Sequence, residues 1–112
     1  MPEFMFLIRE DATKQSSPRQ GKEIVEKFMA WAGQLRERGK FKGGDEVQSN
    51  GRILSMPDGN IVESPFVPAG DSVAGYFLIE ADDYAEATQI ARECPGLHYG
   101  DSIEIRQISD YK

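Results

Sequence analysis

The sequence predicts a single α+β domain, in which two helices cover one face of a four-stranded antiparallel sheet. Three kinds of segment support this prediction: apolar strand-like runs, a long amphipathic segment, and a shorter helical one. Their order is strand, helix, strand pair, helix, strand. That order is typical of a ferredoxin-like βαββαβ fold, here with an extra hairpin between the two central strands. A length of 112 residues suits one domain spanning 1–112.

The N-terminal third supplies the first strand and the long helix. Pro2 to Arg9 is apolar and aromatic, so we expect a strand with apolar side chains on both faces. Ser17-Pro18-Arg19-Gln20 resembles a capping box with proline at the first helical position. A helix over residues 19–38 follows, and Gly39 ends it. Its apolar positions are Ile24, Phe28, Trp31 and Leu35, with Val25, Met29 and Ala32 beside them. We expect Phe28 and Trp31 to be largely buried.

Turn signals divide the middle of the chain. Asn50-Gly51 is a type I′ hairpin signal and predicts a turn between short strands near residues 45–48 and 52–56. A further turn is expected at Asp58-Gly59. Residues 61–72 contain two prolines and a glycine, so no regular structure is predicted there.

The C-terminal third repeats the strand–helix–strand order. Residues 75–81, GYFLIEA, form the clearest strand. Asp82 is predicted to cap the second helix, and Pro95-Gly96 to end it. The apolar stripe of this helix includes Cys94. Residues 102–108, SIEIRQI, alternate strictly and predict the last strand.

Alternation along the strands separates the two faces of the sheet. The residues predicted to face the helices are Phe4, Phe6, Ile8, Phe77, Ile79, Ile103 and Ile105. The opposite face then has an apolar centre of Met5, Leu7, Tyr76 and Leu78, ringed by Arg9, Glu80, Glu104 and Arg106. Such a face is typical of an interface or a ligand cleft, so we expect a homodimer through the helix-free sheet face. The alternative is an exposed sheet with incidental apolar residues.

Composition argues against several partners. The net charge of −6 disfavours nucleic acid and anionic membranes, which both need clustered basic side chains. No apolar run reaches the roughly 18 residues of a membrane span, so a cytoplasmic protein is expected. With one cysteine and one histidine, neither an intrachain disulfide nor a Cys–His zinc site is expected. No phosphate-cradling glycine motif is present, and neither a cofactor nor a metal is predicted.

Few residues suggest chemistry. His98 is a weak catalytic candidate, with a solvated loop histidine as the alternative. Cys94 is interpreted as core. A ligand pocket is hypothesised on the helix-free side, with Pro65 and Pro68 stiffening its edge. Its residues would be Arg9, Glu63, Pro65, Phe66, Tyr76 and Arg106. Alternatively, Phe66 plugs the core edge, and Arg9 and Arg106 pair with Glu80 and Glu104.

Several motifs together resemble the YCII-related, or DGPF-domain, family. They are MAWAGQLRERGKFKGG at 29–44, GYFLIEAD, ECPG and GDSIEIRQI. The resemblance implies the dimeric α+β-barrel type of ferredoxin-like fold, with two sheets packed face to face. It also implies a bacterial protein of regulation or small-molecule metabolism. The segment that names the family reads Glu63-Ser64-Pro65-Phe66 here, and its usual Gly-Gly is Ala74-Gly75.

One branch of that family carries a proposed catalytic His–Asp pair. The resemblance places the histidine near Phe28 and the aspartate at Cys94, so this mechanism does not transfer. The leading interpretation is a dimeric small-molecule-binding or accessory protein. One alternative is an enzyme in the dimer cleft, acting on a small substrate that is anionic if Arg9 or Arg106 holds it. Another is a non-catalytic interaction or regulatory module.

Overall fold

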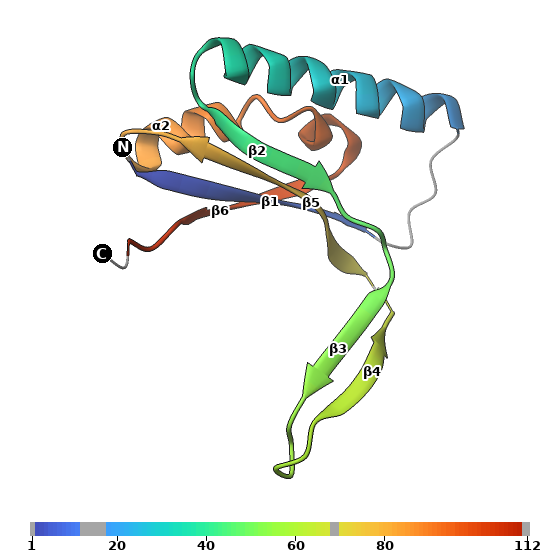
Figure 1. Cartoon of the computed structure of the whole chain (residues 1–112). Coiled ribbons are helices and arrows are strands. Elements are labelled where there is room, and N and C mark those ends of the chain that lie inside the picture. Colours follow the sequence, from blue (N-terminus) through green and yellow to red (C-terminus); the bar gives the residue numbers. More distant parts are fainter. Residues whose placement is uncertain (1, 12–17, 68–69, 111–112) are drawn as a thin grey trace.

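The computed structural model describes residues 2–11, 18–67 and 70–110. Figure 1 shows one sheet with helices on one side and a long β-hairpin on the other. The elements are β1 Glu3–Asp11, α1 Pro18–Glu37, β2 Phe41–Glu46, β3 Gly51–Ser55, β4 Val62–Phe66, β5 Asp71–Glu80, α2 Tyr84–Ala91, the short 3-10 helix η1 Pro95–Tyr99, and β6 Ser102–Gln107.

The main sheet has four strands in the order β2-β5-β1-β6, and all three strand pairs are antiparallel. Strands β1 and β5 lie at the centre, as their apolar residues on both faces require. Both α1 and α2 cover the same face (Figure 1). The ferredoxin-like prediction is therefore confirmed, with the extra hairpin inserted between β2 and β5.

The core lies between the helices and the sheet. Phe4, Phe6 and Ile79 have no exposed surface, and the predicted division between the two faces holds along β1 and β5. The indole of Trp31 stacks on the Phe77 ring with 4.8 Å between ring centroids. Trp31 is 3% exposed, as predicted.

The predicted face of α1 was only partly right. Phe28 is half-buried, since it borders a cleft described below. Val25 and Met29 are exposed, because they lie to one side of the stripe that contacts the sheet. The helix ends close to its predicted limit, and Gly39 follows with φ 71°. The proposed capping box begins at Ser17, outside the described residues.

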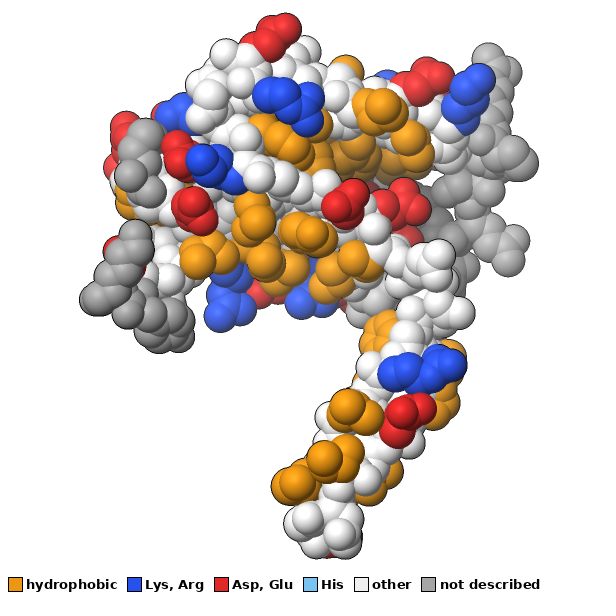
Figure 2. Space-filling model, in the orientation of Figure 1, with side chains coloured by type: hydrophobic (Ala, Val, Ile, Leu, Met, Phe, Trp, Pro, Cys, Tyr) orange, Lys and Arg blue, Asp and Glu red, His pale blue; other side chains and the backbone are white. Residues whose placement is uncertain are grey.

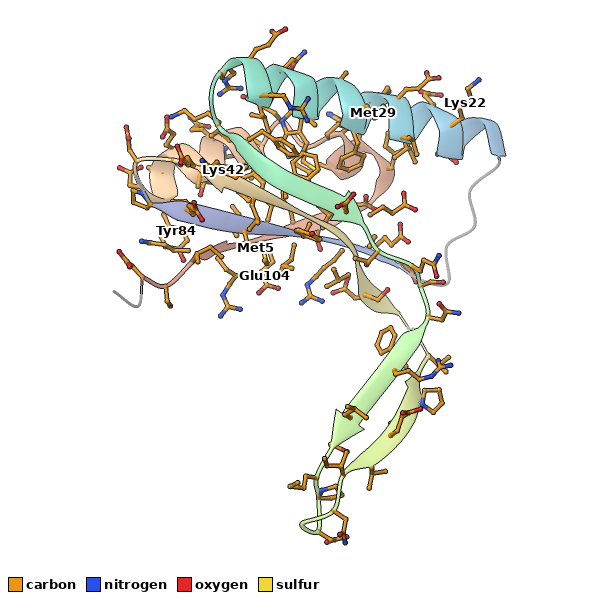
Figure 3. The ribbon with its side chains drawn as sticks, in the orientation of Figure 1. Met5, Lys22, Met29, Lys42, Tyr84 and Glu104 are labelled. Carbon is orange, nitrogen blue, oxygen red and sulfur yellow. The ribbon has the colours of Figure 1, made fainter. Side chains whose placement is uncertain are left out.

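The helix-free face carries the predicted mixture of apolar and charged side chains. Met5 and Glu104 point away from the helices in Figure 3. Met5, Leu7, Tyr76 and Leu78 are all half-buried. Leu7 is paired with Tyr76 on one side and with Glu104 on the other, so the apolar centre and the charged ring are continuous.

The predictions for the middle of the chain were wrong in two places. Asn50-Gly51 does not close a hairpin between the strands around it, because β2 pairs with β5 and β3 pairs with β4. Residues 61–72 are not irregular either: they contain β4 and the start of β5. The turn that closes the hairpin is the one predicted at Asp58-Gly59, where Gly59 has φ 82°.

We call residues 51–66, comprising β3, β4 and their turn, the arm. Pro65 fits within β4 because a two-stranded ribbon leaves one side of each strand unpaired, so its missing N–H is tolerated. The arm projects from the sheet on the side away from α1 and α2 (Figure 1).

The start of α2 also differs from the prediction by one residue. Asp83, not Asp82, is the N-cap: its Oδ1 accepts from the Glu86 N–H at 2.9 Å. The Glu86 Oε1 accepts in return from the Asp82 N–H at 2.6 Å. Cys94 lies beyond the end of α2 and precedes η1, although it is buried as expected for a core residue.

Candidate functional site

A cleft of about 660 Å³ lies between α1 and the β2 side of the sheet. Figure 2 shows it as a hydrophobic hollow below the helix, with acidic side chains near one end. Its apolar walls come from α1, from the neighbouring strands and from the segment after β2. These residues are Ile8, Ile24, Val25, Phe28, Met29, Ala32, Phe41, Val47 and Phe77.

Small residues form part of the sheet side of this hollow. Gly44 on β2 and Gly75 on β5 line it, together with Ala74. A Cβ at Gly44 would meet the Tyr76 carbonyl oxygen and the Phe77 ring, and one at Gly75 would lie 3.0 Å from the Asp45 carbonyl oxygen. The close approach of β2 and β5 therefore requires glycine at both positions.

The charge of the cleft is predominantly negative. Among the described residues, four acidic ones border it, Glu10, Asp45, Glu46 and Asp101, against one basic residue, Arg36. Asp45 is directly opposite Tyr76, so its side chain is on the helix-free face of the sheet, whereas Glu46 is opposite Gly75 and is on the cleft side. Within the described part of the chain, Glu10, Asp45 and Glu46 form no ion pair. The Arg36 guanidinium lies 5.0 Å from the Phe41 ring centroid, so an aromatic wall already binds a cation at one end.

The fold explains why these acidic residues lie at one end of the sheet. Strands β1 and β2 are each antiparallel to β5, so their C-terminal ends lie at the same end of the sheet. Glu10 is at the end of β1, and Asp45 and Glu46 are at the end of β2. Asp101 immediately precedes β6, which starts at that end because it is antiparallel to β1.

The predicted ligand-binding residues of the sheet do lie on one face. Arg9 Nη2 is 2.9 Å from Glu104 Oε1, and Arg106 Nη1 is 3.0 Å from Glu104 Oε2. Hydrogen bonds from Arg106 and Arg9 lower the pKa of Glu104 below its ordinary value. Tyr76 joins them through its pairing with Leu7. The predicted alternative was that Arg9 and Arg106 pair with Glu80 and Glu104. Both arginines pair with Glu104, whereas Glu80 pairs with Lys42 at 3.0 Å.

The other predicted ligand-binding residues are on the arm. Glu63, Pro65 and Phe66 belong to β4, which projects away from the sheet (Figure 1). Glu63 Oε2 is 3.8 Å from Arg52 Nε, and Phe66 is 37% exposed. Within one chain, the structure does not unite them with Arg9, Tyr76 and Arg106, and Phe66 does not plug the core edge. Pro68 lies outside the described residues.

The two candidate chemical groups lie away from the cleft lining. His98 is exposed on η1. Burial raises the pKa of the Cys94 thiol to about 11, so this side chain is a poor nucleophile. Among the described residues, no group of three or more His, Cys, Asp or Glu side chains could hold a metal ion. No described helix is long and apolar enough to cross a membrane.

Comparison with known families identifies the chain. The sequence model of the YCII-related domain matches residues 3–112. The chain belongs to the YCII-related family. A comparison with curated proteins found no match. For this YCII-related protein, Phe28 lines the cleft, while Cys94 is buried in the core. At the two positions that the family resemblance connects with a catalytic pair, this chain therefore has a phenyl ring and a buried thiol whose ionisation is suppressed.

Proposed function

We propose that this YCII-related protein is a homodimer that binds a small molecule in the cleft beneath α1, and that the ligand has an apolar body and a positively charged group. The cleft is the observation that supports the proposal. Its volume of about 660 Å³ lies within the range of roughly 300–1,000 Å³ typical of small-molecule sites.

The chemistry of the lining favours a cation. The rings of Phe28, Phe41 and Phe77 offer apolar area and aromatic faces. Carboxylates at the end of the cleft would attract an ammonium or guanidinium group. Anions would meet the same carboxylates and a chain of net charge −6, so binding of an anionic ligand here is disfavoured.

Binding is favoured over catalysis by the same lining. The residues that the structure describes along the cleft include neither histidine nor cysteine. Carboxylates alone can hold a cation without taking part in a reaction. In the enzyme alternative His98 is the candidate general acid or base, and it does not line this cleft.

Two probes of matched size and opposite charge test this proposal. We expect 2-phenylethylamine to bind with a Kd of about 1 mM, as befits a fragment of its size. We expect 3-phenylpropionate to bind at least about tenfold more weakly. Amide shifts in NMR spectra should map the amine to Gly44, Asp45 and Gly75. Equal affinity for both probes, or shifts confined to another surface, would overturn the proposal.

Charge-neutral variants sharpen the test. The double variant Glu10→Gln/Glu46→Gln should weaken amine binding about fivefold, because two attracting charges are lost. Glu26→Gln/Asp58→Asn changes the net charge equally but lies outside the cleft, so it should leave the affinity within about twofold. Val25→Phe should reduce binding by filling the mouth from an exposed position.

The dimer is proposed from the helix-free face. Its apolar centre would be costly in water, and its charges largely satisfy one another through Glu104. A second copy could therefore cover it without leaving those charges unpaired. Sedimentation at micromolar concentration should give twice the chain mass of 12.5 kDa. A monomer would contradict this part of the proposal and leave the cleft untouched. The cytoplasm remains the expected location.

A further inference from the structure

We propose that the arm is a dimer clasp: the face of the arm that carries Ile53, Val62 and Phe66 packs against a second copy of this chain. This inference rests on the proposed homodimer and adds to it a second contact surface. The argument begins with the arm itself. An isolated two-stranded hairpin is only marginally stable in water, so a well-formed one needs a surface to pack on.

The strand register gives the arm two unlike faces. Directly opposed residues in an antiparallel pair share a face. Phe66 is opposite Gly51, Ile53 opposite Ser64, and Val62 opposite Ser55. This face therefore pairs each large apolar side chain with a small residue, which leaves a surface suited to packing.

The opposite face of the arm suits water. Arg52 is opposite Pro65 and Leu54 is opposite Glu63. Arg52 and Glu63 approach to 3.8 Å across this face, with side chains that are 68% and 66% exposed. Docking through this face would remove two charges from water, so the apolar face is the one to be covered.

One chain exposes more surface than a compact domain of its size. Its radius of gyration is 16.0 Å, whereas a compact domain of this length has about 13 Å. Its accessible surface is 7897 Å², roughly 1,700 Å² more than a globular protein of this mass exposes. A standard protein interface buries about 800 Å² per partner. The excess is therefore large enough for the arm and the helix-free face to be covered together.

The placement of the arm selects a second copy as the partner. The arm and the uncovered sheet face lie on the same side of the molecule (Figure 1). Two chains packed through their helix-free faces would each extend an arm along the other chain. A two-fold interface is isologous, so one association event covers both arms and both sheet faces. A foreign protein would have to match both surfaces separately.

Neighbouring positions on β3 provide a matched crosslinking experiment. Ile53 and Leu54 point to opposite faces of the arm. We would replace each in turn with the photo-crosslinker p-benzoylphenylalanine in the full chain. Irradiation of the position 53 protein should give a covalent band of twice the chain mass, and at least about fivefold more of it than the position 54 protein. Crosslinks within one chain only, or equal yields from both positions, would overturn the clasp.

Measuring the dimer Kd of arm variants tests the clasp separately from the proposed homodimer. Ile53→Ser/Phe66→Ser should raise the dimer Kd at least about tenfold, while Leu54→Ser should change it less than about threefold. Trp31 fluorescence would confirm that each variant is folded. If the wild type is a dimer and both variants keep its Kd, the clasp fails and the dimer stands. If the wild type is a monomer, both fail.

Discussion

Two glycine-to-alanine substitutions should change stability in opposite directions, although each adds the same methyl group. Gly44 lies on β2 opposite Phe77 and lines the cleft. A Cβ there would meet the Tyr76 carbonyl oxygen, and would lie 2.8 Å from the Phe77 Cδ1 and 3.0 Å from its Cα. Two of these three obstacles are backbone atoms, so rotation of a side chain cannot relieve the clash.

Gly33 provides the matched control. It lies inside α1, and a methyl group added to it would have no atom within 4 Å beyond its own helix and chain neighbours. Gly33→Ala should therefore stabilise the fold by about 0.5–1 kcal/mol, because alanine loses less backbone entropy in a helix. Gly44→Ala should cost about 2–3 kcal/mol, the upper part of the range of about 1–3 kcal/mol usual for overpacking, because backbone atoms cannot move freely.

Urea unfolding followed by tryptophan fluorescence measures both effects, since Trp31 is the only tryptophan and is buried. All variants must be compared at one protein concentration, because a dimer has a concentration-dependent midpoint. In a thermal scan, Gly44→Ala should lower Tm by roughly 10 °C, at about 4 °C per kcal/mol. The reasoning would be refuted if Gly44→Ala cost under about 0.5 kcal/mol or if Gly33→Ala were the more harmful change.

Two further predictions concern titratable groups. At pH 8 the Cys94 thiol, with its pKa raised to about 11, should react with Ellman's reagent at least about 100-fold more slowly in the native protein than in guanidinium chloride; rapid native reaction would contradict its burial. Because the folded-state pKa of Glu104 lies below its ordinary value of 4.5, its stabilising effect is present above that pH and is lost as the pH falls through the folded pKa. Urea midpoints should consequently drop between pH 5.5 and 3.5, and Glu104→Gln should show a smaller drop than the charge-matched Glu26→Gln; equal drops would contradict the role of the arginine pairs.

The main sheet could be predicted because its signals agree. Phe4 and Phe6 alternate with Met5 and Leu7, and a strand with apolar residues on both faces belongs at the centre of a sheet. Every inward assignment on β1 was correct. The helices were found for a similar reason, since apolar spacing and terminal signals coincide. The flank of α1 was misjudged, because periodicity does not show how wide the contact with the sheet is, and both ends of α2 were misplaced by one to a few residues.

An extra hairpin, a strand at 52–56 and the turn at Asp58-Gly59 were predicted, but β4 and the pairing of the arm were not, because local turn chemistry competed with strand pairing. Asn50-Gly51 has the composition of a tight hairpin turn, yet β2 gains more by pairing with the long central strand β5. On sequence alone, Pro65 is evidence against a strand. That inference is valid for an interior strand, but not for a two-stranded ribbon, in which each strand has an unpaired edge. The pairing of Pro65 with Arg52 depends on the turn at Asp58-Gly59, six or seven residues from each, and turn signals alone do not show whether this turn or Asn50-Gly51 closes a hairpin.

The cleft was missed because its acidic residues are far apart in the sequence. Glu10, Asp45 and Asp101 look scattered until the strand order is fixed. A usable signal existed: in a ferredoxin-like topology, the ends of the first two strands and the start of the last lie at one end of the sheet. Because acidic residues occur at all three places, the sequence and the predicted topology together could have predicted an acidic cluster at that end of the sheet.

The position of Phe28 connects the cleft with the family resemblance. By that resemblance, the histidine of the family's proposed catalytic pair corresponds to this position on α1, and here Phe28 lines the cleft. An imidazole at this point could exchange protons with a bound molecule, whereas a phenyl ring can only offer apolar area and an aromatic face. The remaining position of the pair, Cys94, is buried with a suppressed thiolate. Neither position therefore supplies an acid–base group, and the ring of Phe28 instead adds aromatic area to the cleft in which we propose that a cation binds.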